Sequence, residues 1–455
     1  MPSPLLDRFR AHLDAAGLLA RPGAAIVAVS GGADSVALLD LLAAVAPSRE
    51  VRLVVAHADH GIQPAARSVG QAVKALAARY ELPFELGELA LGADTSETVA
   101  RSARYGWLGA VQRRHRARYL VTAHHQDDQI ETVLLRALRG SGPAGLAGMP
   151  ARGRGGLVRP LLPFTRAELA AHVAARGLPH HDDPANRDPR HLRSWLRSTL
   201  LPLVIERLGP GAGADLLRLG RQAAADRRAW DRVLGLLPDL GLHETRTGFA
   251  VARHVLASYD NALSVALLRA AARRVGLVLG PVRARRVLAL ARRPSGRRLA
   301  LGEGWTAEVA FDRLRLTRGS GDAAAPVRAT GERGSISFGE FRVSWRPDRA
   351  PGRIRRDAWT TWVEGGGGGW EVRAPGPGDR LVPAGGVGHR PVRRLLMEAR
   401  VPRSERAGYP VVARGETILW VPGVCRGQVA LPRPGTPAVR VDVTRHDEPE
   451  ADRRP

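Results

Sequence analysis

A glycine-rich stretch near the start of the chain has the residue types of an anion-binding loop. Residues 30–35 read S-G-G-A-D-S and lie between a short apolar run and a stretch with helical apolar spacing. Glycines allow a tight turn, and free N–H groups at a helix start point at a bound anion. The common Gly-Lys-Ser/Thr phosphate loop is excluded, because Lys74 is the only lysine. The pattern therefore predicts a lysine-free phosphate site made by Ser30, Gly31, Gly32, Ala33, Asp34 and Ser35.

Asp34 is unusual in such a loop, because a carboxylate and a phosphate repel each other. It could hold a magnesium ion or position the backbone turn. The alternative is an ordinary Gly-rich turn in which Asp34 caps the helix.

A second group of polar residues, H-H-Q-D-D-Q-I-E, brings carboxylates to one helix start. By three- and four-residue spacing, Glu131 shares a helix face with Asp127 and Asp128. These carboxylates could cap the helix, bind a metal, or receive an amine such as that of lysine. His124 and His125 could indicate zinc, but the shortage of cysteine and the nearby nucleotide loop favour magnesium.

Two shorter stretches supply further polar groups. Asp59 and His60 follow the end of a strand-like run, where a turn capped by Asp59 is the alternative. Arg101 and Arg104 are three residues apart, so they share one helix face. Such a pair suits a phosphate or a carboxylate, and a solvated basic face is the plain alternative.

Alternating strands and helices are expected to position these groups. Strands are expected over 24–30, 51–59, 84–91 and 118–125, and helices over 35–46, 65–82, 95–116 and 127–138. This alternation predicts an α/β fold with a doubly wound, Rossmann-like parallel sheet. Ligands of such sheets bind at the carboxyl ends of the strands, where all of these polar clusters except the arginine pair lie.

With 455 residues, the chain is too long for one core and is expected to form about three domains. A helical region with a strand hairpin at 307–318 follows the α/β region, and a small α+β region comes later. The expected divisions are a catalytic domain at 1–210, a mostly helical middle domain at 211–320, a linker and β segment at 321–369, an α+β domain at 370–440 and a disordered tail at 441–455.

The net charge of +25, from 69 basic and 44 acidic residues, favours a polyanionic partner. Nucleic acid is a better candidate than a membrane, since no run of 18 apolar residues exists to span one. Cys425 is the only cysteine, which excludes an internal disulfide and a cysteine metal cluster. A cytoplasmic location is the expectation.

Together these motifs resemble the N-type ATP pyrophosphatases of the PP-loop superfamily, and within them the tRNA(Ile)-lysidine synthetase family. The family motifs S-G-G-x-D-S, D-H-G, A-R-x-x-R-Y and H-H-x-D-D-Q-x-E-T stand here in order. The resemblance is strong over 24–205 and clear over 375–427, whereas 211–365 matches only in position and character. Asp183 and Asn186 fit its D-x-x-N element. The departures from the family pattern are Gln63, His191 and Ser194.

The resemblance implies a ligase that uses ATP and Mg²⁺ and acts on an isoleucine tRNA with a CAU anticodon. ATP would activate the wobble cytidine as an adenylate, and free L-lysine would then displace AMP. Asp34 and Asp128 would bind the metal or organise the phosphate site. Asp59, Asp127 and Glu131 would hold the lysine amine, so the catalytic set is Asp34, Asp59, Asp128 and Glu131.

The resemblance also implies that the middle domain at 211–320 and the α+β domain at 370–440 bind tRNA, and it assigns basic residues to phosphates and to RNA. Phosphate or nucleotide contacts are expected from Arg101, Arg104, His124 and Arg197. Contacts with tRNA are expected from Arg193, Arg390, Arg393, Arg394, Arg403 and Arg406. A homodimer is left open, and no membrane partner is expected.

Three other functions compete. A tRNA thiolase would need persulfide cysteines or an iron–sulfur cluster, and an amidotransferase such as GMP synthetase would need a glutamine-hydrolysing cysteine domain or a partner. A non-catalytic RNA-binding protein would not need the loop and the carboxylates to be intact. Pyrophosphate release with RNA would distinguish an enzyme from a binder, and a requirement for lysine would distinguish the enzymes.

Overall fold

The computed structural model describes residues 4–59, 66–89, 91–92, 95–181, 192–245, 247–319, 325–355, 357–364 and 369–446. Several residues named above lie outside this described part: His60, Gln63, Asp183, Asn186 and His191. The chain forms two compact units, Met1–Arg228 and Ala229–Pro455. The boundary between them falls within a long helix, α10 (Ala212–Gly235).

A five-stranded sheet lies at the centre of the first unit. Its strand order is β3-β2-β1-β4-β5, and every neighbouring pair is parallel. The strands are β1 (Gly23–Ala28), β2 (Val51–Asp59), β3 (Phe84–Glu88), β4 (Tyr119–Val121) and β5 (Leu157–Val158). The predicted doubly wound α/β sheet is therefore confirmed.

The helices of the first unit follow the predicted alternation, with ends shifted by a few residues. They are α1 (Pro4–Ala15), α2 (Ala33–Val45), α3 (Ala66–Arg79), α4 (Glu97–Arg114), α5 (Gln126–Leu138), α6 (Pro143–Leu146), α7 (Arg166–Ala175), α8 (Leu192–Trp195) and α9 (Leu201–Leu208). A π-helical turn, η4 (Leu196–Leu200), joins α8 to α9. Short 3₁₀ turns lie at Pro47–Arg49, Arg154–Gly156 and Pro238–Leu240.

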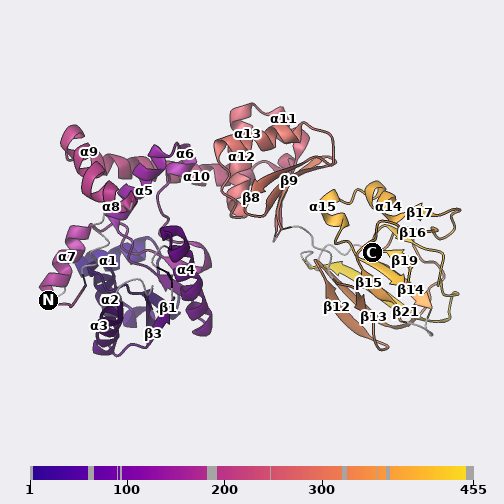
Figure 1. The fold of residues 1–455 in the computed structure, drawn as a ribbon, viewed down its shortest axis with the longest axis horizontal. Helices are drawn as coiled ribbons and strands as arrows, with labels where there is room; N and C mark the ends of the chain where they lie inside the picture. Colours follow the sequence, from indigo (N-terminus) through magenta and orange to yellow (C-terminus); the bar gives the residue numbers. More distant parts are fainter. Residues whose placement is uncertain are drawn as a thin grey trace. The chain divides into compact units, whose positions relative to one another are not determined.

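Both faces of the parallel sheet are covered by helices (Figure 1). On one face, Ala25 and Val27 of β1 are buried with apolar residues of α1, α2, α3 and α7. On the other face, Ile26 packs with Leu108 and Val111 of α4. Since successive strand residues point to opposite faces, a strand buried on both sides reads as one continuous apolar run. This burial fixes β1, and β1 delivers the glycine-rich loop to the carboxyl edge of the sheet.

The first half of the second unit contains three helices and a five-stranded antiparallel sheet of order β6-β7-β10-β9-β8. Its elements are β6 (His243–Thr245), β7 (Gly248–Ala252), α11 (Arg253–Ser258), α12 (Asn261–Arg274), α13 (Pro281–Ala291), β8 (Arg298–Gly302), β9 (Trp305–Ala310) and β10 (Arg313–Arg318). The predicted hairpin at 307–318 is β9 and β10. The other three strands were missed, because they are at most five residues long and include glycine or charged residues.

The second half of this unit contains two larger antiparallel sheets, of orders β11-β15-β18-β19-β20 and β12-β13-β21-β14. The strands are β11 (Val327–Arg328), β12 (Gly334–Phe338), β13 (Phe341–Arg349), β14 (Thr360–Glu364), β15 (Glu371–Arg373), β18 (Val411–Arg414), β19 (Thr417–Val421), β20 (Cys425–Arg426) and β21 (Pro437–Arg445). A two-stranded ribbon, β16 (Arg380–Leu381) with β17 (Arg390–Pro391), precedes α14 (Val392–Glu398) and α15 (Arg403–Arg406).

Strand β21 joins two parts of the chain that the sequence analysis separated, the linker and β segment at 321–369 and the region that follows it. It pairs with both β13 and β14, so residues before and after the glycine-rich stretch near 365 share one sheet and one core. It also continues to Arg445, which places residues 441–445 in that sheet. The domain boundaries predicted from sequence remain predictions.

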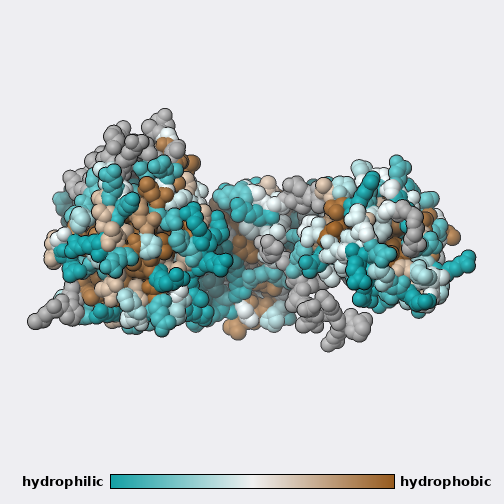
Figure 2. Space-filling view, turned by 90° about the horizontal axis from the view of Figure 1, so that it is seen from below, coloured by the Kyte–Doolittle hydropathy of each residue, from teal (hydrophilic) through white to brown (hydrophobic). Residues whose placement is uncertain are grey.

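On the face shown in Figure 2, hydrophilic residues cover much of the surface, and apolar residues are exposed among them. No helix in the described part of the chain is both long enough and apolar enough to cross a membrane.

Candidate active site

The predicted anion loop connects β1 to the start of α2. Gly31 has φ +92°, and a Cβ there would lie 2.6 Å from Cγ1 of Val69 in α3, so only glycine fits this turn. Ser35 Oγ donates to the carbonyl of Gly32 at 2.8 Å, and Ser30 Oγ lies 3.2 Å from Ser35 Oγ. The first turn of α2 leaves backbone N–H groups without helical acceptors. The loop therefore has the form of a phosphate cradle.

His125 joins this loop to the carboxylate helix. It is the N-cap of α5, it is 3% exposed, and Asp128 accepts its backbone N–H at 3.0 Å. Its Nε2 lies 3.4 Å from Asp34 Oδ2 and 3.6 Å from Asp128 Oδ2, and its Nδ1 lies 3.5 Å from Asp127 Oδ2. Burial acts to lower the pKa of this imidazole, but Asp127, Asp34 and Asp128 outweigh burial and raise it to about 10. His125 is thus a cation that holds three predicted site carboxylates together.

Glu131 lies one helical turn further along α5 and is 3% exposed. Its Oε1 accepts a 2.6 Å hydrogen bond from Nε of Arg197, which comes from the π-helical turn η4. Its Oε2 is buried without a hydrogen-bond partner among the described residues. Burial raises the pKa of Glu131 above its usual value, although Arg197 opposes the shift. The structure thus brings Asp34, Asp128, Glu131 and Arg197 together, since Arg197 Nη2 also lies 3.6 Å from Asp128 Oδ1.

Two other predicted acids have different surroundings. Asp127 accepts the backbone N–H of Arg166 at 2.9 Å, so it also ties α5 to the start of α7. The ion pair with His125 lowers the pKa of Asp127 to about 2. Asp59 is the last residue of β2, which pairs with β1, so it stands at the same edge of the sheet as the loop.

Several arginines surround the other histidine, His124. The pKa of His124 falls to about 3, first because the ring is buried and then because Arg159, Arg101 and Arg104 are near it. The neutral ring pairs its Nδ1 with Oγ1 of Thr122 at 2.9 Å. Arg101 and Arg104 both lie over the ring of Tyr105, at 5.0 and 5.6 Å from its centroid. The predicted helix-face pair is therefore part of a larger positive cluster.

Sequence reasoning missed two residues of this site. His125 was noted only as part of a histidine pair, and nothing in its type indicated that it would be charged while His124 is neutral. Arg159 follows β5, is 8% exposed, and donates to the carbonyl of Pro150 at 2.9 Å, while its buried Nε has no partner in the described part. Arg193 adds positive charge near His124 from α8.

The predicted RNA-contact arginines of the second unit fall into two groups. Arg390 and Arg394 donate to the same carboxylate, Glu398, at 2.6 and 3.1 Å. Arg406 donates to the carbonyl of Val401 at 2.9 Å. Arg393 and Arg403 are exposed, and no hydrogen bond or ion pair engages them within the described residues. Arg393 and Arg403 therefore present their charge to solvent without a partner among the described residues.

Comparison with known proteins identifies the class to which this fold and site belong. Residues 7–204 match the PP-loop domain family, so the first unit is an ATP-utilising PP-loop domain. Residues 370–443 match the family described as the TilS substrate C-terminal domain. A U34-tRNA thiolase from Methanococcus maripaludis covers 48% of the chain and 79% of its own length, at 16% identity and a TM-score of 0.40.

Similarity over the whole chain is more specific. The tRNA(Ile)-lysidine synthase of Symbiobacterium thermophilum is 36% identical over 98% of this chain and 99% of its own length. That of Geobacter sulfurreducens is 32% identical over 92% of this chain and 93% of its own. The chain belongs to the tRNA(Ile)-lysidine synthase family and is an ATP-dependent ligase.

Proposed function

We propose that this chain joins free L-lysine to C2 of the wobble cytidine of an isoleucine tRNA with a CAU anticodon. The names of its relatives support the tRNA substrate and the lysidine product. The observation that carries the proposal is the contact of His125 with both Asp34 and Asp128. This contact places the phosphate loop beside the start of α5, which carries the carboxylates, so ATP and an amine can be bound side by side.

In the first proposed step, O2 of the cytidine attacks the α-phosphorus of ATP. An O–P bond forms, the bond from the α-phosphorus to the bridging oxygen breaks, and pyrophosphate leaves with that electron pair. The N–H groups at the start of α2 and the hydroxyls of Ser30 and Ser35 bind phosphate oxygens. Donors fixed in advance stabilise charge that develops at the transition state.

In the second proposed step, Nε of lysine attacks C2, the C2–O bond breaks, and AMP leaves with the electron pair. The lysine ammonium must first release a proton to become a nucleophile. Glu131 suits this role, because its Oε2 is buried and its raised pKa makes it a stronger base than an ordinary glutamate. Asp59 and Asp127 are proposed to help bind the amine, and Arg101, Arg104 and Arg197 to bind phosphates.

Magnesium is proposed to bind beside the loop through Asp34 and Asp128. Oδ1 of Asp34 is buried without a hydrogen-bond partner in the described part of the chain, as expected of a ligand atom. Mg²⁺ usually takes one or two carboxylates together with water and substrate phosphates, so two aspartates fit it. A cluster of three or more protein ligands is not found among the described residues. When bound, the ion would neutralise phosphate charge. Mn²⁺ titration followed by electron paramagnetic resonance, with ATP present, should show a site that Asp34→Asn weakens.

Incorporation of labelled lysine tests the proposal. Purified protein is incubated with magnesium, ATP, labelled lysine and CAU-anticodon isoleucine tRNA, with the CAU methionine tRNA as control. Incorporation only into the isoleucine tRNA, lost in Asp34→Ala, is expected. Tight tRNA binding without lysine incorporation would contradict the proposal. The same assay with sulfide in place of lysine would then test whether the chain is a tRNA thiolase.

A further inference from the structure

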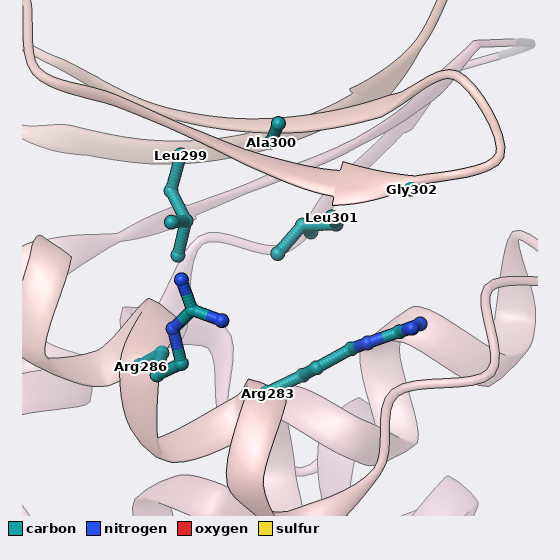
Figure 3. Close-up of a pocket in the computed structure, with 6 residues that line it drawn as sticks. All are labelled: Arg283, Arg286, Leu299, Ala300, Leu301 and Gly302. Atoms are coloured by element: carbon teal, nitrogen blue, oxygen red, sulfur yellow. The ribbon is translucent and has the colours of Figure 1, made fainter.

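A small cavity in the second unit, far along the chain from the loop, is lined by two arginines. Its volume is about 220 Å³, and its walls are Arg283 and Arg286 of α13 and residues 299–302 of β8. Figure 3 shows Arg286 reaching from the helix toward Leu299 and Leu301, with Arg283 extending below Gly302. We propose that this cavity binds a backbone phosphate of the tRNA, an inference that rests on the proposed RNA substrate.

The packing of α13 explains why both arginines face the cavity. Its buried stripe consists of Ala284, Val287, Leu288 and Ala291, which belong to the core of this half of the unit. Arg283 and Arg286 are three residues apart, so they lie together on one flank of that stripe. Arg285 lies on the other flank and does not line the cavity. The helix therefore concentrates two positive charges on the flank that faces β8.

No described residue neutralises the charges of the cavity. Both arginines are exposed, and no hydrogen bond or ion pair to either is found within the described residues. Guanidinium groups match phosphate oxygens in geometry, because they offer several N–H donors in one plane.

Strand β8 supplies the opposite wall. It is an edge strand that pairs only with β9 among the described strands, so one side of its backbone is open. Leu301 is buried and Leu299 partly buried, and they form an apolar floor along which the arginine stems can lie. The plain alternative is that the arginines only cover this floor.

The test compares charge at the cavity with charge elsewhere on the same helix. In the full chain, Arg283→Gln with Arg286→Gln should weaken binding of the isoleucine tRNA about tenfold, and should reduce the slope of log affinity against log salt by about 1, as expected for the loss of one phosphate contact. Arg285→Gln is the matched control and should change the affinity less than the double variant does. The KM for ATP and kcat at saturating tRNA should stay unchanged in both variants.

A second pair of variants tests repulsion at the cavity. Arg283→Glu should repel a phosphate there, whereas Arg285→Glu places the same negative charge on the flank of α13 that does not line the cavity. Arg283→Glu should therefore weaken tRNA binding more than Arg285→Glu does, and equal melting temperatures of the two variants would exclude a difference in stability. Equal effects of the cavity variants and Arg285→Gln, together with equal effects of Arg283→Glu and Arg285→Glu, would overturn the proposal. Cavity-dependent binding without lysine incorporation would instead contradict only the proposed reaction.

Discussion

Arg197 and Glu131 form a half-satisfied pair: Nε of Arg197 donates to Oε1 of Glu131 at 2.6 Å, while Oε2 is buried without a partner among the described residues. A buried carboxylate oxygen left without a donor is costly, so native sites usually supply one. An incoming ammonium group would do so here. In the proposed reaction the pair would thus separate two functions on one side chain, because the protein holds one oxygen and the lysine amine would take the other.

Glu131→Gln should separate the two proposed steps of the reaction. The amide cannot take a proton from lysine, so lysine transfer should fall by roughly 10² to 10⁴. Pyrophosphate release that depends on tRNA should persist, because Glu131 has no proposed part in that step. Quenched-flow assays of pyrophosphate and of lysine incorporation measure both. Equal loss of the two signals, with an unchanged melting temperature, would argue against a role in the second step.

The two adjacent histidines should respond differently to the same substitution. His125→Gln removes the cation that faces Asp34, Asp127 and Asp128, so these carboxylates should repel one another and the first unit should lose about 3 kcal/mol of stability. His124→Gln removes a neutral ring and should cost less. Calorimetry of both variants, with and without an ATP analogue, checks this. A larger loss in His124→Gln would contradict the assignment of charge.

Asp40 should make the stability of the first unit depend on acid pH. It accepts hydrogen bonds from Tyr80 at 2.6 Å, Arg176 at 3.2 Å and His172 at 2.8 Å. Burial would raise the pKa of Asp40, but these three partners outweigh burial and lower it. Since the folded pKa lies below the unfolded value of about 3.9, the stabilisation is complete above that value and is lost as pH falls through the folded pKa.

Asp40→Asn should therefore destabilise α2 and α7 by roughly 2 kcal/mol at pH 7, and variant and parent should converge as the pH falls through the folded pKa of Asp40. Hydrogen exchange of peptides from both helices in the full chain measures the difference. A constant difference at every pH would show that ionisation of Asp40 is not involved.

Arg426 should be essential to the fold of the last sheets. It is 1% exposed, and its two terminal nitrogens donate to the main-chain carbonyls of Trp362, Leu419, Gly427, Val429 and Ala430. Burial lowers its pKa to about 10, so it stays charged at neutral pH. Arg426→Met would leave several buried carbonyls without donors and should cost about 3 kcal/mol or more. Limited proteolysis should then cut β19 and β20 faster, and Arg426→Lys, which has one nitrogen, should not restore protection.

Glu398→Gln should strengthen RNA binding. Removal of this carboxylate would free Arg390 and Arg394, which now share it. Affinity for tRNA should rise by roughly threefold, and its salt dependence should become steeper. Arg393→Gln is the opposing control, because this exposed arginine has no partner in the described residues and its loss should weaken binding. A fall in affinity with Glu398→Gln would mean that the ion pairs shape the RNA site.

Much of the first unit could be predicted from sequence, because its signals are local. Continuous apolar runs followed by polar clusters indicated buried parallel strands and placed Ser30–Ser35 and Asp127–Glu131 at the same edge. The contacts of His125 with Asp34 and of Arg426 with Trp362 could not be predicted, since these partners are distant in the chain. The burial of Arg159 also depends on the fold and has no local signal. The strands of the second unit that were missed have at most five residues, which is too short for an alternating pattern to stand out, and they form because neighbouring strands satisfy their backbones.

The backbone of His125 is extended (φ −121°, ψ −174°), and consecutive side chains of an extended chain point to opposite sides. In the segment between β4 and α5, the ring of His125 therefore faces carboxylates on one side, whereas the ring of His124 faces arginines on the other. Although both residues are histidines, His125 is charged and His124 is neutral. The groups that each ring faces, and not its residue type, therefore set its protonation state.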